Sequence, residues 1–328
     1  MQPLVDMFGR TVGDVRISVT DRCNFRCTYC MPEDYSEWLP KPDILTFEEI
    51  ARLVGVLHGF GIHTVRLTGG EPLMRRELHR LVGMLRGIDP DLDLSLTTNG
   101  FFLRDQADAL AAAGLRRVNV SLDSLRRDRF AEMTRRDALP EVLEGIEAAG
   151  KAGLDPIKVN VVAIRGCNDD EVVDLVDWGR AGGYQVRFIE FMPLDGDHAW
   201  RKDAVFSKRE ILDVIGARHP FRAVGVDERE PAQRYAFEDG RGEFGVIGSV
   251  TEPFCSTCDR IRITADGQLR TCLFALDPFD LRGLLRSGAS DDELADFFRA
   301  AVWTKGPGHQ IGSRGFVQPD RPMVAIGG

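Results

Sequence analysis

The chain has 328 residues, of which 43% are hydrophobic and 28% charged, a composition typical of a globular enzyme. Its net charge of −9 argues against a general nucleic-acid or membrane surface, so an anionic substrate needs positive charges gathered locally. No stretch approaches the roughly 18 consecutive apolar residues of a membrane span, and the N-terminus lacks the pattern of a secretory signal. We therefore expect a soluble, cytoplasmic protein whose thiols stay reduced.

Short apolar runs alternate with amphipathic helical patterns over the first two thirds of the chain. Two of the predicted helices begin with a capping box, at residues 46–49 and 207–210. Strands that alternate with helices predict a parallel sheet, and six repeats favour an α/β fold with an incomplete (β/α)6 barrel of the TIM type. A doubly wound sheet remains the alternative. The six strands are predicted at residues 15–19, 64–67, 92–96, 118–122, 157–163 and 186–191.

Beyond about residue 221 the pattern changes to short β-like runs with a single long helix, at residues 292–302. We place a boundary near residues 218–228, which divides the chain into a barrel at 1–222 and a C-terminal region at 223–328. The β-like runs of this region lie at residues 233–237, 244–247, 261–264 and 269–273.

Three cysteines with the spacing C-x-x-x-C-x-x-C follow the first predicted strand, at Cys23, Cys27 and Cys30. A structural zinc site needs four ligands, and no fourth soft ligand lies nearby in the sequence. Three thiolates on one loop suit three irons of a [4Fe–4S] cube and leave the fourth iron open to a small molecule. A zinc site that takes its fourth ligand from a distant part of the chain is the lower-ranked alternative.

A second set of three cysteines, Cys255, Cys258 and Cys272, has the spacing C-x-x-C-x13-C. His309 is the only later histidine, so a Cys3His zinc site is the alternative here. Two sets of three thiolates in one chain nevertheless favour two [4Fe–4S] clusters. Cys167 belongs to neither set, and we interpret it as a packing residue.

Polar motifs stand at the C-terminal ends of the predicted strands, the face on which parallel α/β barrels build active sites. They comprise residues 68–72, 97–100 and 121–123. Paired glycines in the first of these let the backbone approach a ligand closely. Lys158 and Asn160 share one face of the fifth strand, where a buried lysine is costly unless it meets an anion.

Two arginines, Arg260 and Arg262, share one face of a predicted strand beside the second cysteine set. Guanidinium groups suit the recognition of phosphate. In an acidic protein, a solvent-facing basic strand is the weaker interpretation.

The first cysteine motif resembles the signature of radical S-adenosylmethionine (SAM) enzymes, and residues 69–72, Gly-Gly-Glu-Pro, resemble the motif that holds the amino group of SAM. With the second cysteine set, Arg260–Arg262 and the glycines at 327 and 328, the whole chain resembles the GTP 3′,8-cyclase family of molybdenum cofactor biosynthesis. The resemblance implies a partial (β/α)6 barrel that carries the SAM cluster, followed by a β-rich C-terminal region that carries a second cluster.

The resemblance also implies a role for each matching residue. The two cysteine sets would hold the two [4Fe–4S] clusters, and Gly327 and Gly328 would reach into the active site. SAM would contact Tyr29, Gly70, Ser121 and Met192. GTP would contact Arg16, Arg66, Thr97, Lys158, Arg260, Ile261 and Arg262. The family commonly has Asn where this chain has Asp259, which puts in doubt any contact made by that amide.

The implied reaction is cleavage of SAM to a 5′-deoxyadenosyl radical, which removes hydrogen from the ribose 3′ carbon so that this carbon attacks C8 of guanine. Implied partners are an external one-electron donor of the flavodoxin or ferredoxin type and the next enzyme of the pathway, cyclic pyranopterin monophosphate synthase. The sequence leaves a homodimer open. The alternative functions are a radical SAM peptide maturase and a non-catalytic iron–sulfur electron carrier. Residues 69–72 disfavour the carrier, which has no need of a SAM motif.

Overall fold

The computed structural model describes residues 1–225 and 230–327, which form one twelve-stranded sheet in the order β12-β11-β10-β1-β2-β3-β4-β5-β6-β9-β8-β7. Its first six strands lie side by side in chain order, and each neighbouring pair is parallel. The predicted parallel sheet is confirmed. The order never reverses as a doubly wound sheet requires, so that alternative is excluded. These strands are β1 (Asp14–Ser18), β2 (Thr64–Thr68), β3 (Asp93–Thr98), β4 (Arg117–Ser121), β5 (Ile157–Ala163) and β6 (Gln185–Glu190).

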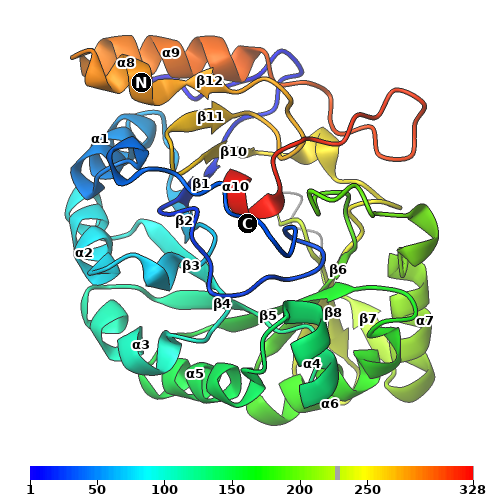
Figure 1. The fold of residues 1–328 in the computed structure, drawn as a ribbon. Helices are drawn as coiled ribbons and strands as arrows, with labels where there is room; N and C mark the ends of the chain where they lie inside the picture. The colour runs from blue at the N-terminus through cyan, green and yellow to red at the C-terminus, as the bar shows by residue number, and fades with distance from the viewer. Residues whose placement is uncertain (226–229, 328) are drawn as a thin grey trace.

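Helices cover the outer face of the curved sheet (Figure 1). Both predicted capping boxes are present, with Thr46 and Ser207 each accepting a hydrogen bond from the amide of a glutamate three residues later. No helix in the described part of the chain is long and apolar enough to span a lipid bilayer. The helices of the barrel are α1 (Phe47–His58), α2 (Leu78–Ile88), α3 (Leu103–Ala112), α4 (Arg127–Thr134), α5 (Leu139–Lys151), α6 (Val172–Gly182) and α7 (Lys208–Arg218).

The β-rich C-terminal region lengthens the barrel sheet at both edges. Strand β9 pairs in parallel with β6, and β10 pairs in parallel with β1. Beyond them, β8 and β7 continue one edge and β11 and β12 the other, all antiparallel. Because β12 and β7 are the two ends of the sheet and do not pair with each other, the barrel stays open. The strands are β7 (Phe221–Ala223), β8 (Gln233–Phe237), β9 (Glu243–Ile247), β10 (Arg260–Ile263), β11 (Gln268–Arg270) and β12 (Phe279–Asp280).

The expected domain boundary near residues 218–228 stays a prediction. Strand β7 spans residues 222 and 223, and residues 226–229 lie outside the described part of the chain. The short elements β7, β12, α8 (Leu281–Arg286) and α10 (Met323–Ile326) were not predicted, because so few residues carry no clear period.

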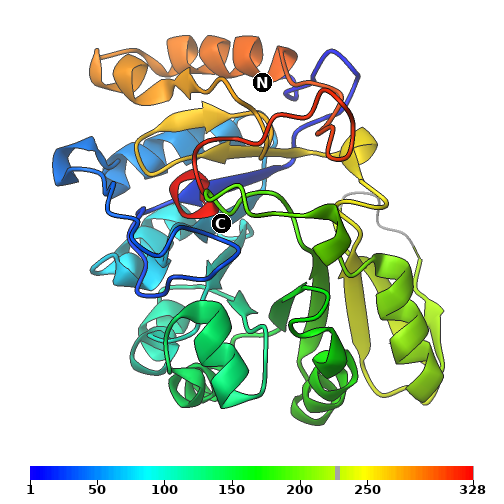
Figure 2. The ribbon, with the colours of Figure 1, turned by 45° about the vertical axis from the view of Figure 1, so that its right-hand side comes forward.

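The last part of the chain returns to the open side of the barrel. After α9 (Asp291–Trp303) it leads to α10, which lies near the loop that follows β6 (Figures 1 and 2). The amide of Met323 donates to the carbonyl of Leu194 at 3.0 Å, and Ile326 packs against Leu194 and Phe274. This small apolar cluster fixes the C-terminal segment beside the strand ends.

Alternation along the strands separates two environments. In β1, Val15 and Ile17 are fully buried in the main hydrophobic core, which the sheet shares with its helices. Arg16 lies between them in sequence and lines a cavity on the other face. The period of two therefore places apolar side chains outside the barrel and polar ones within it.

The close packing of α5 predicts that the stability of the protein is sensitive to a side chain at Gly145. A Cβ atom on Gly145 would lie 2.2 Å from the carbonyl oxygen of Gly100, so Gly145→Ala must displace the backbone after β3. We expect a loss of about 1–3 kcal/mol in unfolding free energy, measured by urea denaturation. Gly83→Ala in α2 meets no atom within 4 Å and should instead stabilise by about 0.5–1 kcal/mol. Equal stabilities of the two variants would contradict this account of the helix contact.

Candidate active site

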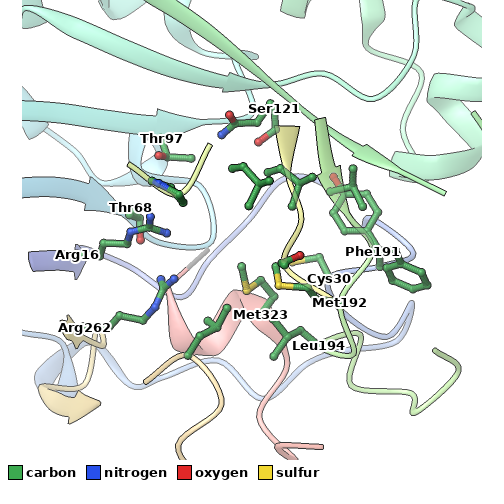
Figure 3. A pocket seen from close by; sticks show the side chains of 18 of the residues that line it. Arg16, Cys30, Thr68, Thr97, Ser121, Phe191, Met192, Leu194, Arg262 and Met323 are labelled. Atoms are coloured by element: carbon green, nitrogen blue, oxygen red, sulfur yellow. The ribbon is translucent and has the colours of Figure 1, made fainter. Parts of the chain in front are cut away.

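One large cavity extends from the C-terminal ends of the parallel strands to the start of β10, and all six cysteines of the two sets line it. Figure 3 shows Arg16 and Arg262 reaching into this cavity from one side, with Cys30, Phe191 and Met192 on the other. Tyr29, Gly70, Thr97 and Ser121 also line it, as their expected roles require. The structure thus brings residues from most of the chain to one place.

The loop of the first cysteine set is held by the paired glycines after β2. The amide of Gly70 donates to the carbonyl of Thr20 at 2.8 Å, and the amide of Glu71 donates to that of Arg22 at 2.7 Å. A Cβ atom on Gly70 would lie 2.4 Å from the carbonyl oxygen of Asp21. Glycine is needed here because the cysteine loop itself passes directly over this backbone. The sequence predicted only that a ligand would approach these glycines closely.

Glu71 is fully buried and ties the ends of two strands together. Its carboxylate accepts hydrogen bonds from the amide of Leu73 at 2.9 Å, the hydroxyl of Thr98 at 2.7 Å and the amide of Asn99 at 2.7 Å. Burial raises the pKa of Glu71 to about 7 in spite of these donors. The side chain of Asn99 donates to Asn24 at 2.8 Å, which extends the network into the cysteine loop.

Tyr29, within the first cysteine motif, donates its hydroxyl to the buried Asp123 at 2.6 Å. Asp123 also accepts from the amide of Val162 on β5 at 2.8 Å, and burial raises its pKa to about 6. The sequence marks residues 121–123 as a polar motif but does not reveal this link, because the bond joins residues 94 positions apart.

The thiols themselves suit metal clusters. All seven cysteines are free. Burial raises the pKa of Cys23 to about 12 and raises those of Cys27 and Cys30 as well, so these thiolates need a positive partner to form. Iron supplies such a charge, and three thiols on one loop beside a cavity fit a cluster with an open iron. Within the described residues, no three Cys, His, Asp or Glu side chains converge closely enough to hold a single metal ion.

The second set joins the sheet at its edge. Cys255 begins a short 3₁₀ turn, Cys258 precedes β10, and Cys272 follows β11. Burial alone would raise the pKa of Cys258, but the charges of Lys305 and Arg260 outweigh it and lower that pKa. Cys167 lies in a turn and does not line the cavity, so its packing role stays a prediction.

Three arginines form a row across adjacent strands. Arg66 on β2 pairs in register with Arg16 on β1, which pairs in register with Arg262 on β10. Burial, together with repulsion from Arg66 and Arg262, lowers the pKa of Arg16 well below its usual value. Arg260 lies at the level of Asp14, one step along the same face.

These guanidinium groups keep unused hydrogen-bond donors. Nε of Arg16, Nε of Arg66, and Nε and Nη2 of Arg260 are buried without a hydrogen-bond partner among the described residues. A buried, unsatisfied donor on a charged group is costly, and several in one cavity are satisfied by a multiply charged anion. The arrangement therefore fits a polyphosphate group.

Lys158, which the resemblance implies as a GTP contact, is absent from the cavity lining. Its Nζ lies 3.4 Å from Oε1 of Glu230, as does Nη2 of Arg187 on β6. Burial, then repulsion from Arg187, lowers the pKa of Lys158 to about 8, and burial lowers that of Arg187 to about 10. Arg187 was missed, although an arginine inside an otherwise apolar strand was a usable signal.

Ile261 differs from its two neighbours. Its side chain is fully buried in the main hydrophobic core, so only its backbone is left for a ligand. Asp259 lies beside Arg260, with its Oδ1 3.3 Å from Nε, and its carbonyl accepts the amides of Gly13 and Asp14 at 3.0 and 3.3 Å. The position that departs from the family pattern thus connects the second cysteine set to β1.

The glycine tail reaches the same cavity wall. Nη1 of Arg262 donates to the carbonyl of Gly327 at 2.8 Å. Gly327 has φ +83°, and a Cβ atom there would lie 3.0 Å from Cβ of Ser18 and 3.2 Å from Oγ1 of Thr68. A side chain would be strained in this narrow space. Gly328 lies outside the described residues.

Comparisons with known proteins agree with this geometry. Residues 17–179 match the Radical SAM superfamily, and residues 184–311 match Molybdenum Cofactor Synthesis C. The chain is 52% identical to GTP 3′,8-cyclase of Streptomyces coelicolor, over 99% of this chain and 96% of the relative. It is 49% identical to GTP 3′,8-cyclase 2 of Mycobacterium tuberculosis, over 99% and 92% respectively.

A solved structure shares the fold. Streptococcus suis SuiB bound to S-adenosylmethionine superposes with a TM-score of 0.62 at 14% identity, covering 88% of this chain and 68% of that chain. Similarity at this identity concerns the fold alone, whereas identity near one half over nearly the full length concerns the family. The chain therefore belongs to the GTP 3′,8-cyclase family of radical SAM enzymes.

Proposed function

We propose that this protein is a GTP 3′,8-cyclase, a radical SAM lyase that converts GTP to (8S)-3′,8-cyclo-7,8-dihydroguanosine 5′-triphosphate in the first step of molybdenum cofactor biosynthesis. The observation that carries the proposal is the row of arginines, with buried unused donors on Arg16, Arg66 and the adjacent Arg260, set in the same cavity as both cysteine sets. The family membership of the chain supports the same conclusion.

The first half of the cavity would bind SAM. Cys23, Cys27 and Cys30 would hold a [4Fe–4S] cluster, and the backbone at Gly70, which lines the cavity, would approach the amino group of SAM. Tyr29, Ser121 and Met192 would complete the SAM contacts.

The second half would bind GTP. Arg16, Arg66, Arg260 and Arg262 would receive the triphosphate, and Thr97 lines the cavity beside them. Cys255, Cys258 and Cys272 would hold the second [4Fe–4S] cluster, which would help to position the guanine base. Lys158 would also contact GTP if a phosphate replaced Glu230 as its ion-pair partner. Ile261 would contact GTP through its backbone.

With SAM and the reduced first cluster bound, the site would supply a 5′-deoxyadenosyl radical, which would take a hydrogen atom from C3′ of the ribose and leave as 5′-deoxyadenosine. Bonding of C3′ to C8 of guanine would then need one electron and one proton to give the 7,8-dihydro product, and the external donor would supply the electron. The protein contributes position and shielding. Phe191, Met192 and Leu194 present apolar surface to the cavity and help exclude water. The arginines fix the triphosphate and so limit the motion of the ribose attached to it.

The proposed reaction needs partners in the cytoplasm. An external one-electron donor of the flavodoxin or ferredoxin type would reduce the first cluster. The product would pass to cyclic pyranopterin monophosphate synthase, the next enzyme of the pathway. A homodimer remains an open part of this proposal.

Anaerobic turnover with GTP, SAM and dithionite tests the proposal directly. Changing Cys23, Cys27 and Cys30 together to Ala should leave about half the iron and abolish SAM cleavage. Changing Cys255, Cys258 and Cys272 together should also halve the iron, but SAM cleavage should persist while cyclised product is lost.

Cys167→Ala is the matched control, because this thiol lines no part of the cavity, and it should keep both clusters and full activity. SAM cleavage that persists in the first triple variant would refute the cluster assignment. A peptide offered in place of GTP separates cyclase from maturase, and modification of the peptide without cyclisation of GTP would refute the function.

Lys158 should make GTP binding depend on pH. Its pKa of about 8 leaves the amine largely neutral above that pH in the free protein. A bound triphosphate favours the ammonium and raises this pKa, so binding near pH 8.5 should take up a proton, and affinity should fall as the pH rises from about 7 to 9.

Calorimetry in buffers of different ionisation enthalpy measures that uptake. Lys158→Met should remove it and weaken binding roughly tenfold at neutral pH. The same proton uptake in the variant would show that another group is responsible.

The tail should assist cyclisation without building the fold. Deleting Gly327 and Gly328 should nearly abolish product in a single turnover, because Arg262 loses the carbonyl that it now contacts. Iron content and SAM binding should stay near wild type. Val317→Ser, at an exposed position of the same segment, is the control and should change none of these. Product formation at the wild-type rate by the truncated protein would contradict a role for the tail.

A further inference from the structure

A buried lysine lies against the second cysteine set. Lys305 follows the end of α9 by two residues, and only 2% of its surface is exposed. Burying an ammonium group is expensive unless acceptors compensate for the lost water. Among the described residues, no carboxylate lies within ion-pair distance of Lys305, so its compensation comes from other groups.

Two acceptors receive the ammonium. Nζ of Lys305 donates to the carbonyl of Arg260 at 2.5 Å and to Sγ of Cys258 at 3.5 Å. Both acceptors belong to the short stretch that leads from the second cysteine set into β10. The lysine therefore contacts at once a thiol that would ligate iron and the backbone of an arginine expected to bind phosphate.

The position of Lys305 is fixed from outside by Arg10. Nη1 of Arg10 donates to the carbonyls of Cys255 at 2.7 Å and Pro307 at 3.1 Å, and Nη2 donates to that of Gly306 at 2.5 Å. Arg10 is held in turn by an ion pair between its Nε and Oδ2 of Asp6, at 2.5 Å. These hydrogen bonds hold segment 305–308 in close contact with the second cysteine set. A Cβ atom on Gly308 would lie only 2.3 Å from Cβ of Cys255.

We propose that Lys305 is a positioning residue of the second cluster, whose ammonium donates to the Cys258 thiolate and makes the cluster easier to reduce. Reduction adds negative charge, and a nearby buried cation stabilises that charge. Hydrogen bonds to the ligating sulfurs and local charge are the means by which a protein sets the potential of an iron–sulfur centre. The inference needs a cluster at the second set but does not need cyclase activity.

Three substitutions of Lys305 separate the effect of its positive charge from the effect of its hydrogen bonds. Lys305→Gln keeps a neutral donor, Lys305→Met keeps the length without a donor, and Lys305→Arg keeps the charge. Each is made in the full chain with Cys23, Cys27 and Cys30 changed to Ala, so that only the second cluster is observed, and also in the protein with both clusters. Lys151→Gln, at an exposed lysine on α5, is the control.

The measurement is a redox titration of the second cluster followed by electron paramagnetic resonance. Gln and Met at position 305 should lower the equilibrium constant for reduction by about tenfold, a shift of 59 mV to more negative potential for a one-electron couple. Arg should restore the wild-type value, and the Lys151 control should not differ from it. If Lys305→Gln loses the cluster while Lys305→Arg keeps it at wild-type potential, the charge is again the property required.

Two results would overturn the inference. A wild-type potential in Lys305→Gln would show that the lysine only holds the Arg260 backbone in place and does not affect the cluster. Equal shifts in the Arg and Gln variants would show that charge has no effect. Because iron content and potential are read without GTP turnover, neither result depends on whether the protein cyclises GTP.

Discussion

Three guanidinium groups side by side inside a barrel are the constraint on which this site depends. Arg66, Arg16 and Arg262 stand in register on β2, β1 and β10, and Nε of Arg66 and of Arg16 has no hydrogen-bond partner among the described residues. Asp14 is the nearest counter-charge along β1, and a single carboxylate cannot balance the row. A bound polyanion would relieve the repulsion among these groups, and that relief would contribute free energy for ordering a substrate.

The open barrel explains why one cavity serves two cysteine sets. The first set follows the C-terminal end of β1, whereas Cys255 and Cys258 of the second set precede the N-terminal end of β10, its parallel neighbour in the sheet. Their shared strand pair keeps the two loops at a fixed separation. The apolar contacts of Ile326, Leu194 and Phe274 then cover the side that the sheet leaves open.

Much of this arrangement could be predicted because its signals are local. The cysteine spacings, the capping boxes at Thr46 and Ser207, and the alternation within each barrel strand all lie within short windows of sequence. The strand predicted at residues 157–163 agrees with β5 at both ends. Each of these features depends on neighbours in the chain, which the sequence displays directly.

What could not be predicted depends on contacts between distant residues. The pairing of β10 with β1 joins positions about 245 apart, and no local pattern encodes it. The same holds for Lys305, whose burial beside Cys258 is visible only when α9 is placed on the sheet. Lys158 illustrates the opposite case, since its face was predicted correctly while its partner, Glu230, lies on another part of the fold.

The pairing of β1 with β10 also bears on how the chain folds. Until β10 is made and docked, β1 has only β2 beside it and presents a bare edge of unpaired backbone groups, the kind of edge that favours association with other chains. Closing a loop of this length is slow compared with forming the local βα units. The cysteine loop after β1 is therefore attached to an incomplete sheet until β10 pairs with β1. During this interval the partly folded chain is most prone to aggregation and to oxidation of its thiols.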